Sequence, residues 1–180
     1  MASWGKCDFK QLKNFQERLQ KLEKNDFDAF CESCAKELAA RLLAKVIKRT
    51  PVGKYDKPVK FTTKDGRQVS FTPHTGKKGG TLRRGWTAKT EAEAKSGGKS
   101  DVQGYVSAMP ITKTGNVYQV EIINPVTYAS YVEFGHRTRN HEGWAKGKFM
   151  LTISEDELQA QSPKILEGKL KKYLEAIFND

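Results

Sequence analysis

Two long segments with helical apolar spacing flank the middle of this chain, and any fold has to bury both of them. In the first segment, apolar side chains recur every three to four residues and predict one buried helical face: Phe27, Phe30, Cys34, Leu38, Leu42 and Val46. Asn25 can cap this helix. Pro51 should end it near Arg49, because the residue before a proline avoids helical angles.

The second long segment is predicted to begin at Ser154, which has the spacing of a capping box with Glu157. Its apolar stripe follows at helical spacing: Leu166, Leu170, Tyr173, Leu174 and Ile177. Pro163 should either kink this helix or restart it. A further helix is predicted near the N-terminus, after a cap at Asp8.

Between the long helices, apolar and polar residues alternate as they do in strands. Val59–Thr72 predicts a β-hairpin around the turn dipeptide Asp65-Gly66. Further alternating runs begin at Trp86, Val102 and Tyr118 and predict a three-stranded antiparallel meander with turns at 97–98 and 115–116. The predicted class is α+β: an antiparallel β-sheet of three to four strands packed against a long helix in the N-terminal half and a C-terminal helix, with a β-hairpin arm.

The length of 180 residues is sufficient for one domain with its own core. We therefore predict a single domain over residues 1–180. Residues 1–25 would form an N-terminal helical extension, and residues 54–80 would form the hairpin arm and a basic loop.

The chain is basic, with 32 Lys and Arg against 21 Asp and Glu, a formal charge of +11. The excess is concentrated between Lys45 and Lys89, where thirteen basic residues face only Asp56 and Asp65. Such a segment favours contact with nucleic acid or with an acidic protein surface. Its candidate contact residues are Lys54, Lys57, Lys60, Lys64, Arg67, Lys77 and Lys78.

No spacing of residues predicts catalysis, a cofactor or a metal site. The glycines and lysines of residues 76–80 lack the order of a phosphate-binding loop. Cys31 and Cys34 share a helical face, but Cys7 and the histidines are distant in sequence, so free thiols are expected rather than a zinc site. No apolar run is long enough for a transmembrane helix, and the N-terminus lacks the apolar centre of a signal peptide. We expect a non-enzymatic protein that stays in the cytosol where it is made.

Four sequence blocks occur in the order found in one family of phage proteins. These are KVIKRTPVG at Lys45–Gly53, GTLRRGW at Gly80–Trp86, INPVTYASYVEFGHRT at Ile123–Thr138 and GKFML at Gly147–Leu151. In these blocks the chain resembles the "gene product ten"-like tail components, the tail-completion or head–tail joining proteins of tailed phages.

The resemblance implies a structural virion protein that forms a ring, expected to be hexameric, at the neck of the particle. Its implied partners are further copies of itself, the head connector or stopper protein and the tail terminator protein, with possible non-specific contact to DNA in the channel. Two alternatives remain open: the tail terminator ring itself, and a basic nucleic-acid-binding protein. Binding of duplex DNA by the isolated protein, with an affinity that falls steeply as salt is raised, would distinguish the nucleic-acid-binding protein from the two ring proteins.

Asn124 and Pro125 should open a short helix that Gly135 ends. We expect Tyr128, Phe134 and Phe149, together with Leu170, to be core residues. Glu133 should pair with Arg137 or Arg139, or with a neighbouring subunit. Candidate residues of the subunit or partner interface are Arg83, Arg84, Glu133, His136, Arg137, Arg139 and Trp144.

Overall fold

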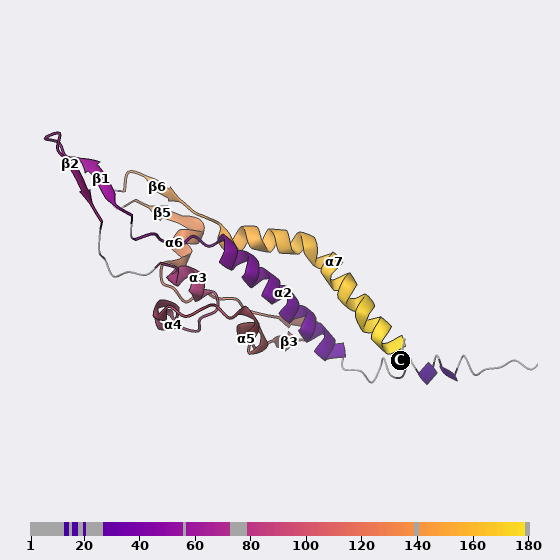
Figure 1. Ribbon diagram of the computed structural model, residues 1–180. Helices are drawn as coiled ribbons and strands as arrows, with labels where there is room; N and C mark the ends of the chain where they lie inside the picture. The colour runs from indigo at the N-terminus through magenta and orange to yellow at the C-terminus, as the bar shows by residue number, and fades with distance from the viewer. Residues whose placement is uncertain are drawn as a thin grey trace, which may run out of the picture.

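The computed structural model describes residues 13–14, 16–17, 20, 27–55, 57–72, 79–138 and 141–178. Two long helices, α2 (Phe27–Arg49) and α7 (Met150–Phe178), lie side by side and form the spine of an elongated molecule (Figure 1). The α+β class and both long helices are confirmed. The predicted Asp8 and Asn25 caps lie outside the described residues.

Polar and aromatic contacts join the two long helices along their length. Glu157 of α7 accepts hydrogen bonds from Lys45 at 3.0 Å and from Arg49 at 2.6 Å. Toward the other end, the rings of Phe30 and Tyr173 stack with their centroids 4.4 Å apart. The helix α7 continues through Pro163 and bends along its length (Figure 1), as expected for a proline inside a helix.

The predicted start of α7 is wrong. The helix begins at Met150, so Ser154 lies inside it, is fully buried and donates a hydrogen bond to the carbonyl of Met150 at 2.6 Å. Glu157 therefore bonds α2 and does not close a capping box. The local spacing alone could not show that another part of the chain caps this helix.

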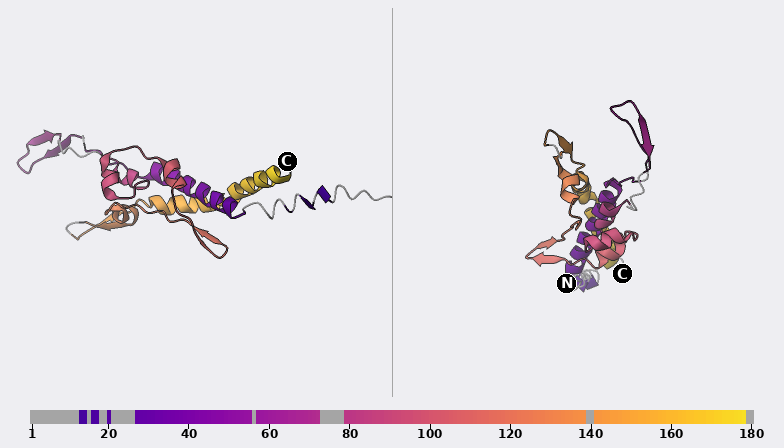
Figure 2. Two further views of the ribbon diagram at one scale, coloured as in Figure 1. Left: turned by 90° about the horizontal axis from the view of Figure 1, so that it is seen from below. Right: turned by 90° about the vertical axis from the view of Figure 1, so that its left-hand side faces the viewer.

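The strands form three separate antiparallel hairpins. The first joins β1 (Val59–Thr62) to β2 (Gln68–Phe71), as predicted, with Gly66 in the left-handed conformation at its turn. The others join β3 (Thr112–Thr114) to β4 (Val117–Gln119), and β5 (Gly135–Arg137) to β6 (Trp144–Lys146). The hairpins project from the helical body in different directions (Figure 2).

The predicted three-stranded meander, and with it the single sheet of three to four strands, is wrong for the part of the chain that the structure describes. Most of its residues form turns and two short helices, α4 (Glu91–Ser96) and α5 (Val102–Ser107). A third short helix, α3 (Thr81–Gly85), comes directly before them. Thr90 caps α4 by accepting from the Glu93 amide, and Asp101 caps α5 by accepting from the Gly104 amide. These caps satisfy amides that a helix leaves unpaired, and they outweigh the alternating apolar pattern.

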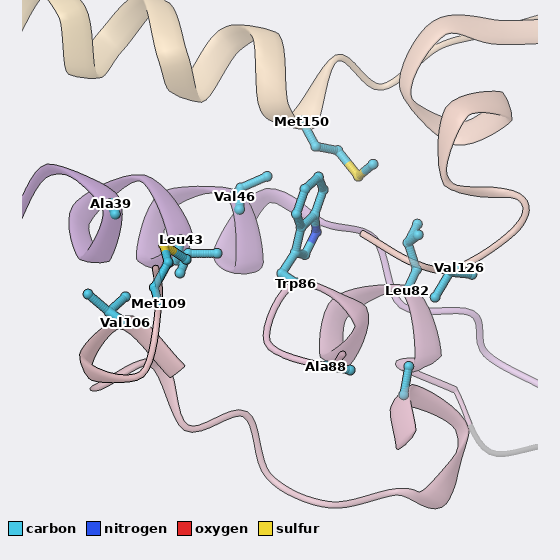
Figure 3. Close-up of a cluster of buried hydrophobic side chains, with 11 residues drawn as sticks. Ala39, Leu43, Val46, Leu82, Trp86, Ala88, Val106, Met109, Val126 and Met150 are labelled. Atoms are coloured by element: carbon cyan, nitrogen blue, oxygen red, sulfur yellow. The ribbon is translucent and has the colours of Figure 1, made fainter. Parts of the chain in front are cut away.

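The core lies where the short helices pack against α2 and the start of α7. Its fully buried members include Leu43, Val46 and Met150, with Trp86 placed between α2 and α7 (Figure 3). The indole N–H of Trp86 donates to the buried hydroxyl of Thr50 at 2.8 Å. This bond satisfies a polar group that would be costly to bury alone.

The four sequence blocks meet around this core. Arg83 of the second block donates twice to the carbonyl of Thr50 in the first, at 2.6 and 3.2 Å. Asn124 of the third block donates to the carbonyl of Leu82 at 2.9 Å. A side chain at Gly85 would come within 2.2 Å of the Asn124 oxygen. These contacts therefore hold the start of the third block, and with it the short helix that follows Asn124, against the core.

A candidate interaction surface on the α6–β5–β6 unit

The short helix α6 (Ala129–Phe134) leads through Gly135 directly into the β5–β6 hairpin. Gly135 has φ 89°, which favours glycine. The predicted end of the helix is confirmed, but its predicted start is wrong. Asn124 accepts from the amide of Val126 and bonds Leu82, so the chain makes a turn before α6 begins.

Glu133 joins this unit to α7. Its side chain is 6% exposed, and its carboxylate accepts from the Leu151 and Thr152 amides at 3.0 Å and from the Thr152 hydroxyl at 2.9 Å. A helix N-terminus has unpaired amides and a positive dipole end, so a buried carboxylate is well placed there. Glu133 therefore caps α7 and does not pair with Arg137; Arg139, the other predicted partner, lies outside the described residues.

Backbone contacts also hold the unit firmly against the start of α7. The amides of Lys148 and Phe149 donate to the carbonyls of Val132 and Glu133 at 2.8 and 3.0 Å. A Cβ atom at Gly147 would come within 2.2 Å of the Glu133 carbonyl oxygen, so only glycine allows this approach. The hairpin is thus fixed to the spine at its base.

Large aromatic side chains project from this fixed base into solvent. The exposed fractions are 59% for Tyr131, 61% for Phe134 and 59% for Trp144. Arg137 and Trp144 are paired across the hairpin, which places them on one face, and His136 packs edge-on against Tyr131 at 5.9 Å. We call the exposed group Tyr131, Phe134, His136, Arg137 and Trp144 the aromatic hairpin.

The core prediction for Tyr128, Phe134, Phe149 and Leu170 is wrong, because all four side chains are exposed. Val126, Val132 and Met150 fill the inner side of this region instead. A helix of six residues has too few turns for its apolar spacing to show which side faces inward.

The predicted interface residues fall into two groups. Arg83, Arg84 and Glu133 bond within the subunit; Arg84 donates to the carbonyls of Ala94 and Gly79 at 2.8 and 3.1 Å. His136, Arg137 and Trp144 are exposed together on the aromatic hairpin. Arg139 lies outside the described residues.

The predicted basic contact residues of the arm are exposed: Lys54, Lys57, Lys60, Lys64 and Arg67. The strand register places Val59, Phe61, Val69 and Phe71 on one face of the β1–β2 hairpin and Lys60 on the other. Lys77 and Lys78 lie outside the described residues. The arm thus combines an apolar face with a polar one that carries Lys60.

Among the described residues, no group of three or more His, Cys, Asp or Glu side chains could hold a metal ion. Cys31 and Cys34 are free thiols, and burial raises the pKa of Cys34. None of the described helices has the length and apolar character needed to cross a membrane.

Comparison with known proteins identifies one family. The family described as "Bacteriophage HK97-gp10, putative tail-component" matches residues 13–135, which is more than half of the chain. The match includes the first two sequence blocks and the third as far as Gly135. No curated protein and no solved structure matches the chain significantly.

Proposed function

The chain belongs to the HK97 gp10-like family of bacteriophage tail components and is a structural protein of the virion, and on this premise we propose that it is a ring-forming subunit that completes the tail at the neck. In this role it would join the head connector or stopper protein to the tail terminator protein around the DNA channel. The alternative within the same class is the tail terminator ring.

The aromatic hairpin is the observation that carries the proposal. Trp, Tyr and Arg are the residues most enriched among those that dominate binding energy at protein interfaces. Here Trp144, Tyr131 and Arg137 are exposed together on a base that the buried Glu133 holds to α7 by hydrogen bonds. A fixed, exposed aromatic group fits a protein that works by assembly.

A closed ring requires each subunit to offer two different faces, since head-to-tail contacts repeat around the axis. The elongated body and its separately directed hairpins offer such faces (Figure 2). We propose sixfold symmetry, as the family resemblance implies. Light scattering and electron microscopy of the purified protein, alone and with its neck partners, test this proposal; a protein that stays monomeric and absent from particles would overturn it.

The two ring assignments differ in what happens when the gene is removed. A terminator ends growth of the tail, so its loss should give tails of uncontrolled length. Loss of a completion protein should instead leave tails of normal length that do not join heads. Measuring tail lengths in lysates of the deletion phage therefore separates the two.

The basic arm favours a second role, contact with DNA or with an acidic partner. Its described segment, residues 57–72, carries Lys57, Lys60, Lys64 and Arg67 against Asp65 alone. Contacts to several phosphates make binding steeply dependent on salt. Binding of duplex DNA by the isolated protein at increasing salt is the test, and salt-independent or undetectable binding favours an acidic protein partner.

A further inference from the structure

The short helices, the β3–β4 hairpin and the segment that follows it line a hollow of about 870 Å³ on the molecule's surface. Its apolar lining includes Tyr105, Met109, Val120 and Ile123. A volume of this size lies within the range of roughly 300–1,000 Å³ found for sites that enclose most of a drug-sized ligand. It is therefore large enough to receive aromatic side chains.

Charged groups also line this hollow. The acids are Glu93, Asp101 and Glu121; the bases are Lys89, Lys99 and Arg84, and the last already bonds two backbone carbonyls. Glu93 lies near Tyr105, whose pKa is raised by burial and by this carboxylate. Carboxylates that accept one bond keep further lone pairs, so the hollow can still accept hydrogen bonds from a cationic partner.

The aromatic hairpin has the complementary character. It protrudes from the body, and Arg137, Lys146 and Lys148 on and beside it are exposed. Aromatic and arginine anchors in protein interfaces typically fill pockets on the partner. The hairpin presents Trp144 and Arg137 on one face and His136 and Ala145 on the other. Side chains on both faces suit insertion between the walls of a hollow better than contact with a flat surface.

The hairpin and the hollow cannot meet within one subunit. The helices α4 and α5 lie on one side of α2, whereas the β5–β6 hairpin projects on the other (Figures 1 and 2). Two complementary surfaces on opposite sides of one chain are the requirement for a head-to-tail contact between copies.

We propose that the aromatic hairpin of one subunit inserts into the hollow between α3, α4, α5 and β4 of the next, so that Trp144 and Phe134 meet Tyr105 and Met109 while Arg137 faces the hollow's carboxylates. This inference rests on the proposed ring and names the two surfaces that build it. The occupant of the hollow is thus a second copy of this chain.

Two variants test the contact. Phe134→Ser with Trp144→Ser removes the hairpin anchors, and Ala108→Trp with Glu121→Lys fills the hollow and reverses a charge. All four positions are exposed, so the fold should survive. Val117→Ser, at an exposed position of β4 that does not line the hollow, is the matched control. Each test variant should raise the dissociation constant for self-association about tenfold or more, as expected for loss of dominant anchors, and the control should not.

Mixing the two variants gives the decisive measurement. Each keeps one working surface, so an equimolar mixture should form a heterodimer and nothing larger, as judged by analytical ultracentrifugation under conditions in which the wild type assembles. A mixture that stays monomeric, or variants that form rings as the wild type does, would overturn the contact.

These experiments distinguish a failure of the proposed ring from a failure of the proposed contact. If the wild type forms rings but the mixture gives no heterodimer, the ring stands and its interface lies elsewhere. If the wild type forms no ring with or without neck proteins, the proposed function fails. The heterodimer is then sought at the highest concentration tested for the wild type, and its absence overturns the contact as well.

Discussion

Glu133 shows how one residue can connect the interaction surface to the spine. Its buried carboxylate accepts three hydrogen bonds from the first turn of α7. Glu133→Gln keeps the volume but removes the charge and one acceptor, so we expect a loss of roughly 1–3 kcal/mol in the free energy of unfolding. Chemical denaturation measures it, with the exposed Glu155→Gln as control; equal stability of both variants would contradict the cap.

Phe134 and Trp86 are aromatic residues with opposite roles. Phe134 is mostly exposed, whereas Trp86 is 4% exposed and bonds Thr50. We expect Trp86→Ala to cost roughly 3–5 kcal/mol and Phe134→Ala to change stability by no more than about 0.5 kcal/mol. Thermal melts of the monomer compare them. A large loss in Phe134→Ala would place that side chain in the core after all.

Glu157 should make the stability of the α2–α7 contact depend on pH. Hydrogen bonds from Lys45 first, and also from Arg49, hold the pKa of its carboxyl below the usual value. A carboxyl whose pKa is lower in the folded state than in the unfolded state stabilises the fold at pH values above its unfolded-state pKa of about 4.3. This stabilisation is lost as the pH falls through the folded-state pKa. The wild type should thus exceed Glu157→Gln in stability at neutral pH, and the difference should disappear in acid.

Chemical denaturation of the wild type and of Glu157→Gln, from neutral pH down into acid, measures this difference in stability. Glu167→Gln, an exposed position on the same helix, is the control and should track the wild type. A difference between wild type and Glu157→Gln that persists unchanged into acid would show that the carboxylate charge is not responsible.

At the scale of elements, three two-stranded hairpins stand apart from one another, although such a hairpin alone is only marginally stable in water. β3–β4 is held to α2, because Lys113 and Tyr118 both bond Asp28. β5–β6 is held through Glu133 and Gly147. The arm, β1–β2, exposes the apolar face that includes Phe61 and Phe71.

Deleting Lys57–Thr72 should therefore leave a folded protein that does not join heads to tails. The arm projects from the body (Figure 1), and its removal leaves the buried cluster around Val46 and Trp86 intact. Circular dichroism and a joining assay with heads and tails from a deletion phage measure the two effects. Phe61→Ser with Phe71→Ser in the full-length chain removes the apolar face but keeps the arm's length, so it shows which of the two is needed for joining. An unfolded deletion protein would contradict this interpretation, as would normal joining.

At the scale of the whole molecule, the formal charge of +11 is carried partly by the exposed arm. If the arm contacts DNA, each phosphate it neutralises adds about −0.9 to the slope of log affinity against log salt. Lys60→Gln with Lys64→Gln should then make the slope less steep by roughly 1.8. Val117→Ser should leave it unchanged. An unaltered slope in the double variant would assign the arm to a protein partner.

Local sequence determined the features that depend on neighbouring residues alone. Pro51 ended α2 near Arg49, Asp65-Gly66 set the turn of the arm, and Gly135 ended α6. Gly66 and Gly135 adopt positive φ angles that glycine favours, and Pro51 keeps the residue before it out of helical angles. The caps Thr90 and Asp101 were also present in the sequence, but the alternating apolar pattern around them favoured strands.

Tertiary structure decided which sides of the short elements face inward. Nothing near Glu133 in the sequence indicates that it caps a helix beginning seventeen positions later, at Met150. Nor does the spacing of Tyr131 and Phe134 show that they face solvent. In a short element the apolar pattern fits more than one orientation, so packing against distant segments selects one; that selection places the aromatic hairpin and the hollow on opposite sides of the molecule.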